Sequence, residues 1–79
     1  MQVILAEQVR EVPGTVQGEL RLRLVEIADG LQTIPKGSPL WKSMTMSGFL
    51  LEIGAWRFEY RIDADNHLLV TSALYKGSK

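Results

Sequence analysis

Strict alternation of apolar and charged side chains over residues 56–63 is the feature that most limits how this chain can fold. The order there is Trp56, Arg57, Phe58, Glu59, Tyr60, Arg61, Ile62 and Asp63. A period of two is typical of a strand with one face in the core and the other in solvent. A slip of one residue would bury two arginines, so the pattern also sets the register. We expect the apolar side to form the core. Full burial of each large side chain there contributes about 1.5–3 kcal/mol to the stability of the fold.

Two further strands flank this segment and are joined to it by short turns. The apolar residues 49–53 end at Gly54-Ala55, and the strand-like residues 67–75 follow a turn at Asp65-Asn66. Glycine, aspartate and asparagine favour the backbone conformations that tight turns need. Three strands joined by two hairpins form an antiparallel meander.

The N-terminal part predicts a first strand over residues 1–5, whereas residues 16–28 fit two interpretations. Residues 19–24 alternate with period two, as a strand does, but a longer window shows an apolar stripe at helical steps of three and four. The stripe comprises Val16, Leu20, Leu24, Ile27, Ala28 and Leu31, and it is widened by Leu22 and Val25. We favour the helix, because its ends carry helix signals as well.

Three such signals support a helix in this region. Thr15 follows Pro13-Gly14 and can cap the first turn. Glu19 and Arg23 form an i,i+4 pair in the favourable order. Gly30 lies where a left-handed residue often ends a helix.

Residues 31–46 are expected to form a long connection anchored in the core. They contain Pro35, Gly37 and Pro39, which interrupt regular structure. Leu40 and Trp41 are the expected anchors, because a large exposed aromatic side chain would be a liability. In order, the elements predict an α+β fold, with an N-terminal strand and a helix or helical hairpin packed on an antiparallel sheet of about four strands.

Length and composition favour one globular domain covering residues 1–79. Apolar residues make up 46% of the chain and charged residues 23%, as in ordinary globular domains. No apolar run approaches the ~18 residues of a membrane span, and the start lacks the basic leader of a signal peptide. The absence of cysteine excludes disulfides and thiolate metal sites. We expect a cytoplasmic protein with no cofactor, metal or membrane contact.

The chain is formally neutral, with nine basic and nine acidic residues, which argues against nucleic-acid binding through net charge alone. Residues 1–35 hold three basic and five acidic residues, whereas residues 36–79 hold six basic and four acidic ones. A split of this size can arise without any function. If the protein binds an anionic partner, the second half is expected to do so.

Arg57 and Arg61 are the best candidates for a binding site from the residues alone. They lie about 13 Å apart on the outer side of the expected strand. Glu59 lies between them, so the favoured interpretation is a ladder of cross-strand salt bridges on a solvated face. Each exposed pair of this kind contributes about 0–1 kcal/mol to stability. The functional alternative is a pair that binds phosphate, because guanidinium groups match phosphate oxygens. His67, the only histidine, is expected to be a surface turn residue.

Three motifs follow one another in residues 48–79. They are Leu51-Glu52-Ile53-Gly54, then Ala55-Trp56-Arg57-Phe58-Glu59-Tyr60, and then an apolar strand ending in Tyr75-Lys76. This order resembles the RelE/ParE superfamily of bacterial toxins, including its RelE-like and HigB-like branches. The family pattern is a strand ending near Leu-Arg-x-Gly, an aromatic-Arg-hydrophobic-x-Tyr strand, and an apolar strand running into basic residues. The first strand, helical region and Pro-containing loop are also similar, so the resemblance covers nearly the whole chain.

The resemblance implies the toxin of a type II toxin–antitoxin pair, silenced by a cognate antitoxin that lays a helix and an extended segment over it. In the ribonuclease branch the toxin acts on mRNA at the ribosome, and basic side chains on the sheet stabilise charge at the scissile phosphate. Arg57 matches the family's arginine in the aromatic-Arg strand, and Lys76 and Tyr75 fall at its C-terminal catalytic positions. The residues expected to bind RNA are Arg61, Lys42 and Lys79.

Departures from the family pattern keep other functions open. Leu50 and Glu52, preceded by Gly48, stand where nuclease members often carry Lys or Arg. Loss of one such charge stabiliser typically costs about 3 kcal/mol in the transition state. The alternatives are a ParE-like inhibitor of DNA gyrase and a degenerate, non-catalytic toxin fold. From other classes, the chain fits an interaction module that uses a sheet edge or the Trp41 region and, with less support, a small nucleic-acid binder.

Overall fold

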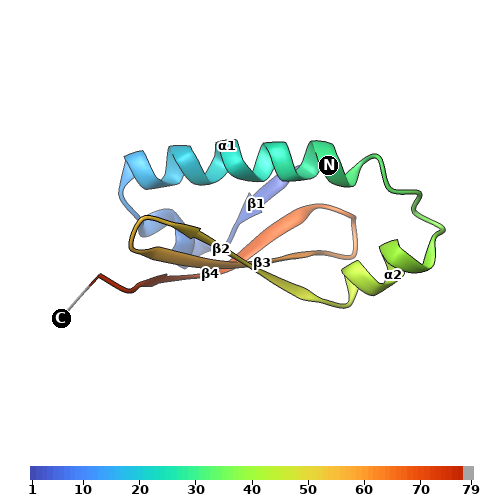
Figure 1. Ribbon diagram of the computed structural model, residues 1–79. Helices are drawn as coiled ribbons and strands as arrows, with labels where there is room; N and C mark the ends of the chain where they lie inside the picture. The colour runs from blue at the N-terminus through green and yellow to red at the C-terminus, as the bar shows by residue number, and fades with distance from the viewer. Residues whose placement is uncertain (78–79) are drawn as a thin grey trace.

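The computed structural model describes residues 1–77 as a four-stranded sheet with one long helix along one face (Figure 1). Strand β1 (Val3–Leu5) is followed by the short 3-10 helix η1 (Glu7–Glu11) and by helix α1 (Gly14–Leu31). Helix α2 (Pro39–Thr45) comes next, and after it strands β2 (Gly48–Ile53), β3 (Trp56–Ile62) and β4 (Leu68–Tyr75). The predicted α+β class is confirmed. None of the described helices combines the length and the hydropathy needed to cross a membrane.

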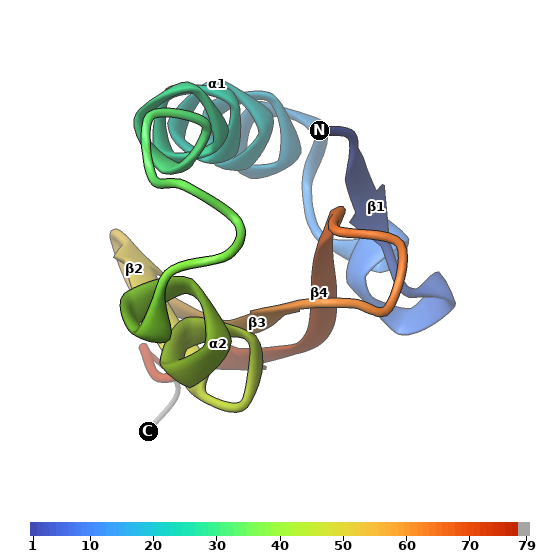
Figure 2. The ribbon, with the colours of Figure 1, turned by 90° about the vertical axis from the view of Figure 1, so that its right-hand side faces the viewer.

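The strand order is β1-β4-β3-β2, so the first strand pairs with the last. Both predicted hairpins are confirmed, because β3 pairs in antiparallel register with β2 and with β4. The expectation of an antiparallel sheet throughout is wrong, because β1 runs parallel to β4, with Val3 opposite Leu68. Figure 2 shows β1 and β2 at the two opposite edges of the sheet. A parallel pair needs a long crossover connection, and here all the other elements lie between its two strands in the sequence.

The core fills the space between α1 and the inner face of the sheet. β3 buries every second residue, as its alternation predicts, and α1 buries one residue in every four. The buried residues are Leu5, Val9, Val12, Leu20, Leu24, Ala28, Trp41, Phe58, Tyr60, Ile62, Leu68 and Val70. The expectation that Leu22 and Val25 widen the buried face of the helix is wrong, because they are 68% and 50% exposed. The helix therefore contacts the sheet along a narrow stripe of side chains, and the side chains next to this stripe lie in solvent.

Helix α1 confirms the helical interpretation of residues 16–28 but not its predicted ends. The helix begins at Gly14, so Thr15 lies within its first turn, and the N-cap residue Pro13 makes no side-chain capping bond. At the other end the backbone N–H of Gln32 donates to the carbonyl oxygen of Ala28, 3.0 Å away. Helical bonding therefore continues past Gly30, which is not left-handed as predicted.

Helix α2 corrects the prediction that residues 31–46 form one long connection. Ser38 caps this helix by accepting a hydrogen bond from the backbone N–H of Trp41 (3.2 Å), and Pro39 occupies the first turn. A proline is favourable there because the first N–H groups of a helix have no partner within it. Trp41 is buried as predicted, but Leu40 is 57% exposed and is therefore not an anchor.

The two predicted turns are confirmed at Gly54-Ala55 and at Asp65-Asn66. Gly54 has φ 57° and Asn66 has φ 63°, the left-handed conformation that favours glycine and asparagine. An irregularity not predicted from the sequence occurs in β4. Glu59 lies opposite Ser72 and Tyr60 opposite Val70, so Thr71 is an extra residue that bulges out of the ladder. Beyond this bulge the residues of β4 that face the core change from even-numbered to odd-numbered.

Candidate functional site

The side chains that point away from α1 form the outer face of the sheet. The strand registers arrange them in three cross-strand rows, namely Glu52–Arg57–Leu74, Leu50–Glu59–Ser72 and Gly48–Arg61–Leu69. Alternation in a strand sends successive side chains to opposite faces, and the buried residues of β3 define the inner face. Arg57, Glu59 and Arg61 therefore share the outer face, as the sequence predicts.

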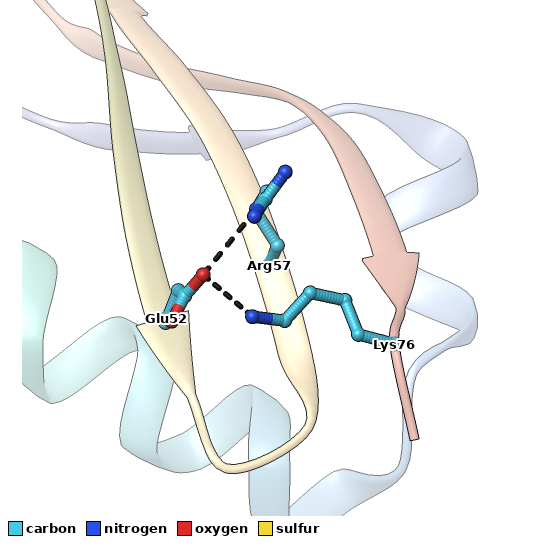
Figure 3. Close-up of polar contacts among 3 residues, drawn as sticks. All are labelled: Glu52, Arg57 and Lys76. Atoms are coloured by element: carbon cyan, nitrogen blue, oxygen red, sulfur yellow. Dashed lines mark hydrogen bonds and ion pairs between the residues drawn. The ribbon is translucent and has the colours of Figure 1, made fainter. Parts of the chain in front are cut away.

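Two residues of the first row, Glu52 and Arg57, form a cluster of three charged residues with Lys76, which follows β4 (Figure 3). We call it the Glu52 cluster. The same carboxylate oxygen of Glu52, Oε2, accepts a hydrogen bond from Arg57 Nε (3.3 Å) and from Lys76 Nζ (2.6 Å). Glu52 and Arg57 lie directly opposite each other in the β2–β3 ladder. Lys76 is held just beyond β4 by its backbone N–H, which donates to the carbonyl oxygen of Ala55 (2.6 Å). Two strands and the segment after a third thus converge on one oxygen atom.

The Glu52 cluster combines one acidic side chain with two basic ones. Hydrogen bonding and charge from Lys76, and then hydrogen bonding from Arg57, hold the pKa of the Glu52 carboxyl below its ordinary value. The side chains of Glu52, Arg57 and Lys76 are 50%, 41% and 34% exposed, respectively. A phosphate in solution can therefore reach both cations.

A shallow depression of about 250 Å³ adjoins Arg57 on the outer face. It is lined by Leu50, Arg57, Glu59, Ser72 and Leu74. Glu59 accepts a hydrogen bond from the Ser72 hydroxyl (3.0 Å) and forms no ion pair with either arginine among residues 1–77. The expected cross-strand salt bridge on this face thus exists, but its acid is Glu52. Leu50 and Leu74, which are 59% and 56% exposed, give the depression apolar walls.

The other residues predicted to act in the site lie apart from the Glu52 cluster. Arg61 lies on the same face, beside a hollow of about 300 Å³ that Gly48 and Thr71 also line. Tyr75 lies opposite Trp56 in the ladder and packs against its ring with the centroids 5.1 Å apart. Its side chain is therefore on the inner side of the sheet, away from Arg57.

Lys42 lies in a different part of the molecule from the outer face. It lines a cleft of about 710 Å³ between α2 and the β3–β4 turn, together with Lys36, Trp41 and Asp63. The ammonium group of Lys36 lies 5.3 Å from the centre of the Trp41 ring. Lys79, also predicted to bind RNA, lies outside the described residues.

His67 has a structural role at the sheet edge. Its Nδ1 accepts a hydrogen bond from the backbone N–H of Gln2 (3.0 Å), and its own backbone N–H donates to the Asp63 carboxylate (2.9 Å). It therefore joins the start of β1 to the β3–β4 turn. Within residues 1–77, no group of three or more His, Asp or Glu side chains is arranged to hold a metal ion.

Glu52 is the site residue that sequence reasoning missed. The family resemblance marks it only as an acid at a position where nuclease members of the RelE/ParE superfamily often carry Lys or Arg. A two-residue turn at Gly54-Ala55 places Ile53 opposite Trp56 and therefore Glu52 opposite Arg57. Counting back from that turn would have identified the pair from the sequence.

Comparison with known proteins finds no family model, no curated protein and no solved structure that matches this chain. The likeness to the RelE/ParE toxins therefore depends on the strand motifs and on the order of the elements. Function has to be inferred from the side chains of the outer face and from what their geometry can do.

Proposed function

We propose that this chain is a RelE/ParE-type toxin of a bacterial type II toxin–antitoxin pair and that it cleaves mRNA at the ribosome in the cytoplasm. The observation that carries this proposal is the Glu52 cluster, in which a guanidinium group and an ammonium group converge on one point of an uncovered sheet face. The order of strand, helices and three-stranded meander also supports it. A cognate antitoxin is the expected partner, and the reaction needs no cofactor.

The Glu52 cluster contains the groups that cleavage of RNA through its own 2′-hydroxyl requires. Arg57 and Lys76 bind the scissile phosphate and stabilise the charge that builds up on it. Glu52 accepts the proton of the 2′-hydroxyl, and the resulting oxygen attacks phosphorus. As the new P–O2′ bond forms, the P–O5′ bond breaks, and the leaving oxygen takes a proton from Lys76. The products are a 2′,3′-cyclic phosphate and a 5′-hydroxyl end.

Other features of the outer face suit a single RNA strand. Leu74 lies beside Arg57 and Leu50 lies in the next row, beside Glu59; both are exposed and offer apolar contacts to the nucleotide next to the scissile phosphate. Arg61 follows at about 13 Å along β3 and forms no ion pair among residues 1–77. It is therefore available to bind another phosphate of the same strand.

Inducible expression in a bacterial host tests this proposal. The wild-type chain is expected to arrest growth and to generate cleaved mRNA, and Arg57→Ala is expected to abolish both effects. Arg21→Ala is the matched control, because it removes the same charge from an exposed position on α1. The proposal is wrong if the wild type does not arrest growth or if Arg57→Ala arrests it equally well.

A second candidate is a ParE-like gyrase inhibitor or a non-catalytic toxin fold. Two observations favour it: Arg57 is already paired with Glu52, and Tyr75 lies on the opposite side of the sheet from Arg57. Growth arrest with intact mRNA and gyrase-dependent DNA damage would identify the gyrase inhibitor. The absence of arrest, together with concentration-dependent association in sedimentation, would identify the interaction module.

A further inference from the structure

We propose that Glu52 occupies, in the free protein, the position of the substrate phosphate between Arg57 and Lys76, so that RNA binds by displacing this carboxylate. The inference rests on the proposed function in one respect, the identity of the anion. Beyond that function, Glu52 competes with the substrate phosphate for Arg57 and Lys76, and substrate binding frees the Glu52 carboxylate from these two partners so that it can act as a base.

The hydrogen bonds of the cluster define the position that an incoming anion must take. Glu52 Oε2 accepts two hydrogen bonds, one from Arg57 Nε and one from Lys76 Nζ. A phosphodiester offers two charged oxygen acceptors with one negative charge, so it can replace the carboxylate at both donors. The two anions cannot use the same Arg57 N–H and the same Lys76 ammonium group in the same way at once.

The exposure of the three side chains makes the exchange feasible. Each is between 34% and 50% exposed, and Glu52 is attached to a strand at the edge of the sheet. Exposed ion pairs of this kind are weak and screened by salt. A carboxylate that loses its partners at this exposed position is hydrated there, beside the bound strand, so displacement leaves no buried charge.

Displacement also changes what Glu52 can do. Its pKa is lowered mainly by Lys76 and then by Arg57, and both partners turn to the phosphate when RNA binds. The carboxylate then becomes a stronger base while it stays next to the nucleotide. The chain would therefore develop its base only when a phosphate is in place.

The other charged side chains near the cluster do not share its hydrogen bonds. On the outer face, Glu59 and Arg61 come from β3, and Glu59 is already bonded to Ser72. Glu59 is therefore an acid on the same face that does not compete for Arg57 or Lys76. It provides a matched control for Glu52.

The test measures binding of a single-stranded 2′-deoxy oligonucleotide, which offers phosphates but has no 2′-hydroxyl and cannot be cleaved. Glu52→Gln is expected to tighten binding by about two- to tenfold, because two exposed ion pairs no longer compete. Glu59→Gln removes the same charge and is expected to have a clearly smaller effect. No change in Glu52→Gln, or equal changes in both variants, would overturn the proposal.

A second measurement uses the unmodified side chain. Carbon NMR of the wild-type Glu52 carboxyl group is expected to show its pKa rising toward the ordinary value when the oligonucleotide is bound. A pKa that stays low in the complex would mean that Arg57 and Lys76 remain on Glu52, and would overturn displacement.

Cleavage of an RNA oligonucleotide separates this inference from the proposed function. Glu52→Gln is expected to bind the strand more tightly and yet to cleave it more slowly than the wild type. A wild-type chain that cleaves no RNA, on or off the ribosome, but shows the binding and NMR effects would disprove the nuclease function and leave the displacement intact.

Discussion

Glu52 and Arg57 face each other across the β2–β3 hairpin, with Arg57 Nε 3.3 Å from Glu52 Oε2. The pair is fixed by a two-residue turn in which Gly54 has φ 57°. Lys76 reaches the same oxygen from beyond β4. The position of a cation after the last strand is thus tied to a turn more than twenty residues earlier in the sequence.

Lys76→Ala is expected to reduce RNA cleavage by about 10²-fold or more, because it removes both a phosphate ligand and the proposed proton donor. Arg21→Ala also removes one positive charge, from an exposed position on α1, and is expected to leave the rate constant for cleavage near that of the wild type. Single-turnover cleavage of an RNA oligonucleotide measures both. Equal losses in the two variants would indicate a general effect of charge.

Acid is expected to destabilise the fold partly through Glu52. The folded-state pKa of this carboxyl lies below its ordinary value of 4.5, with hydrogen bonding from Lys76 as the largest cause. Its contribution to stability is therefore present above pH 4.5 and is lost as the pH falls through the lowered pKa. Thermal unfolding at neutral pH and at about pH 3 should show a smaller loss of Tm in Glu52→Gln than in the wild type. An identical pH dependence in the two proteins would contradict this, and Glu59→Gln serves as the control.

Strongly alkaline solution is expected to act through Tyr60. Burial raises the pKa of its phenol above 10.0, so the stability that it contributes is present below about pH 10 and decreases above it, as the unfolded chain ionises first. Tyr60→Phe keeps the ring that stacks on Phe49, with the centroids 5.3 Å apart. The variant should lose less stability than the wild type between about pH 9 and pH 11, as measured by denaturant unfolding. A loss equal to that of the wild type would exclude Tyr60 as the source.

Phe58→Ala is expected to lower the free energy of unfolding by about 3–5 kcal/mol, because the side chain is fully buried at the centre of β3. Leu22→Ala also shortens an apolar side chain, but this residue is 68% exposed on α1. A change within about 0.5 kcal/mol is expected there. Urea unfolding of both variants measures the difference, and comparable losses would show that the outer side of α1 is packed against something in solution.

The last three strands were predictable because local patterns decide them. Alternation in residues 56–63 and turn residues at Gly54 and Asn66 fix faces and hairpins, and the observed strand ends lie within one residue of those predicted. The bulge at Thr71 could not be predicted in this way, because residues 68–75 contain no glycine, proline, aspartate or asparagine that would mark it. The parallel pairing of β1 with β4 could not be predicted either, because a strand of three residues has no pattern that distinguishes parallel from antiparallel pairing.

Helix ends were harder to predict than helices. Helix α1 begins directly after Pro13 and keeps helical hydrogen bonding as far as Gln32, so the predictions that Thr15 and Gly30 are its caps are wrong. The signals for α2, a serine followed by proline, were present but were interpreted as a loop because Pro35 and Gly37 precede them. In the site, the outward arginines were predicted from alternation, whereas the pairing of Glu52 required the register of a neighbouring strand.

The pairing of β1 with β4 has a consequence for how the chain is made. Gln2 and His67 are 65 positions apart and yet are joined by a hydrogen bond, so the N-terminal strand has no sheet partner until β4 has been synthesised. Contacts between such distant segments close late and slow folding. A nascent chain that has reached only β3 lacks both the neighbour of its first strand and the lysine that completes the Glu52 cluster. Folding and assembly of the cluster should therefore finish together, after the ribosome has released the C-terminal strand.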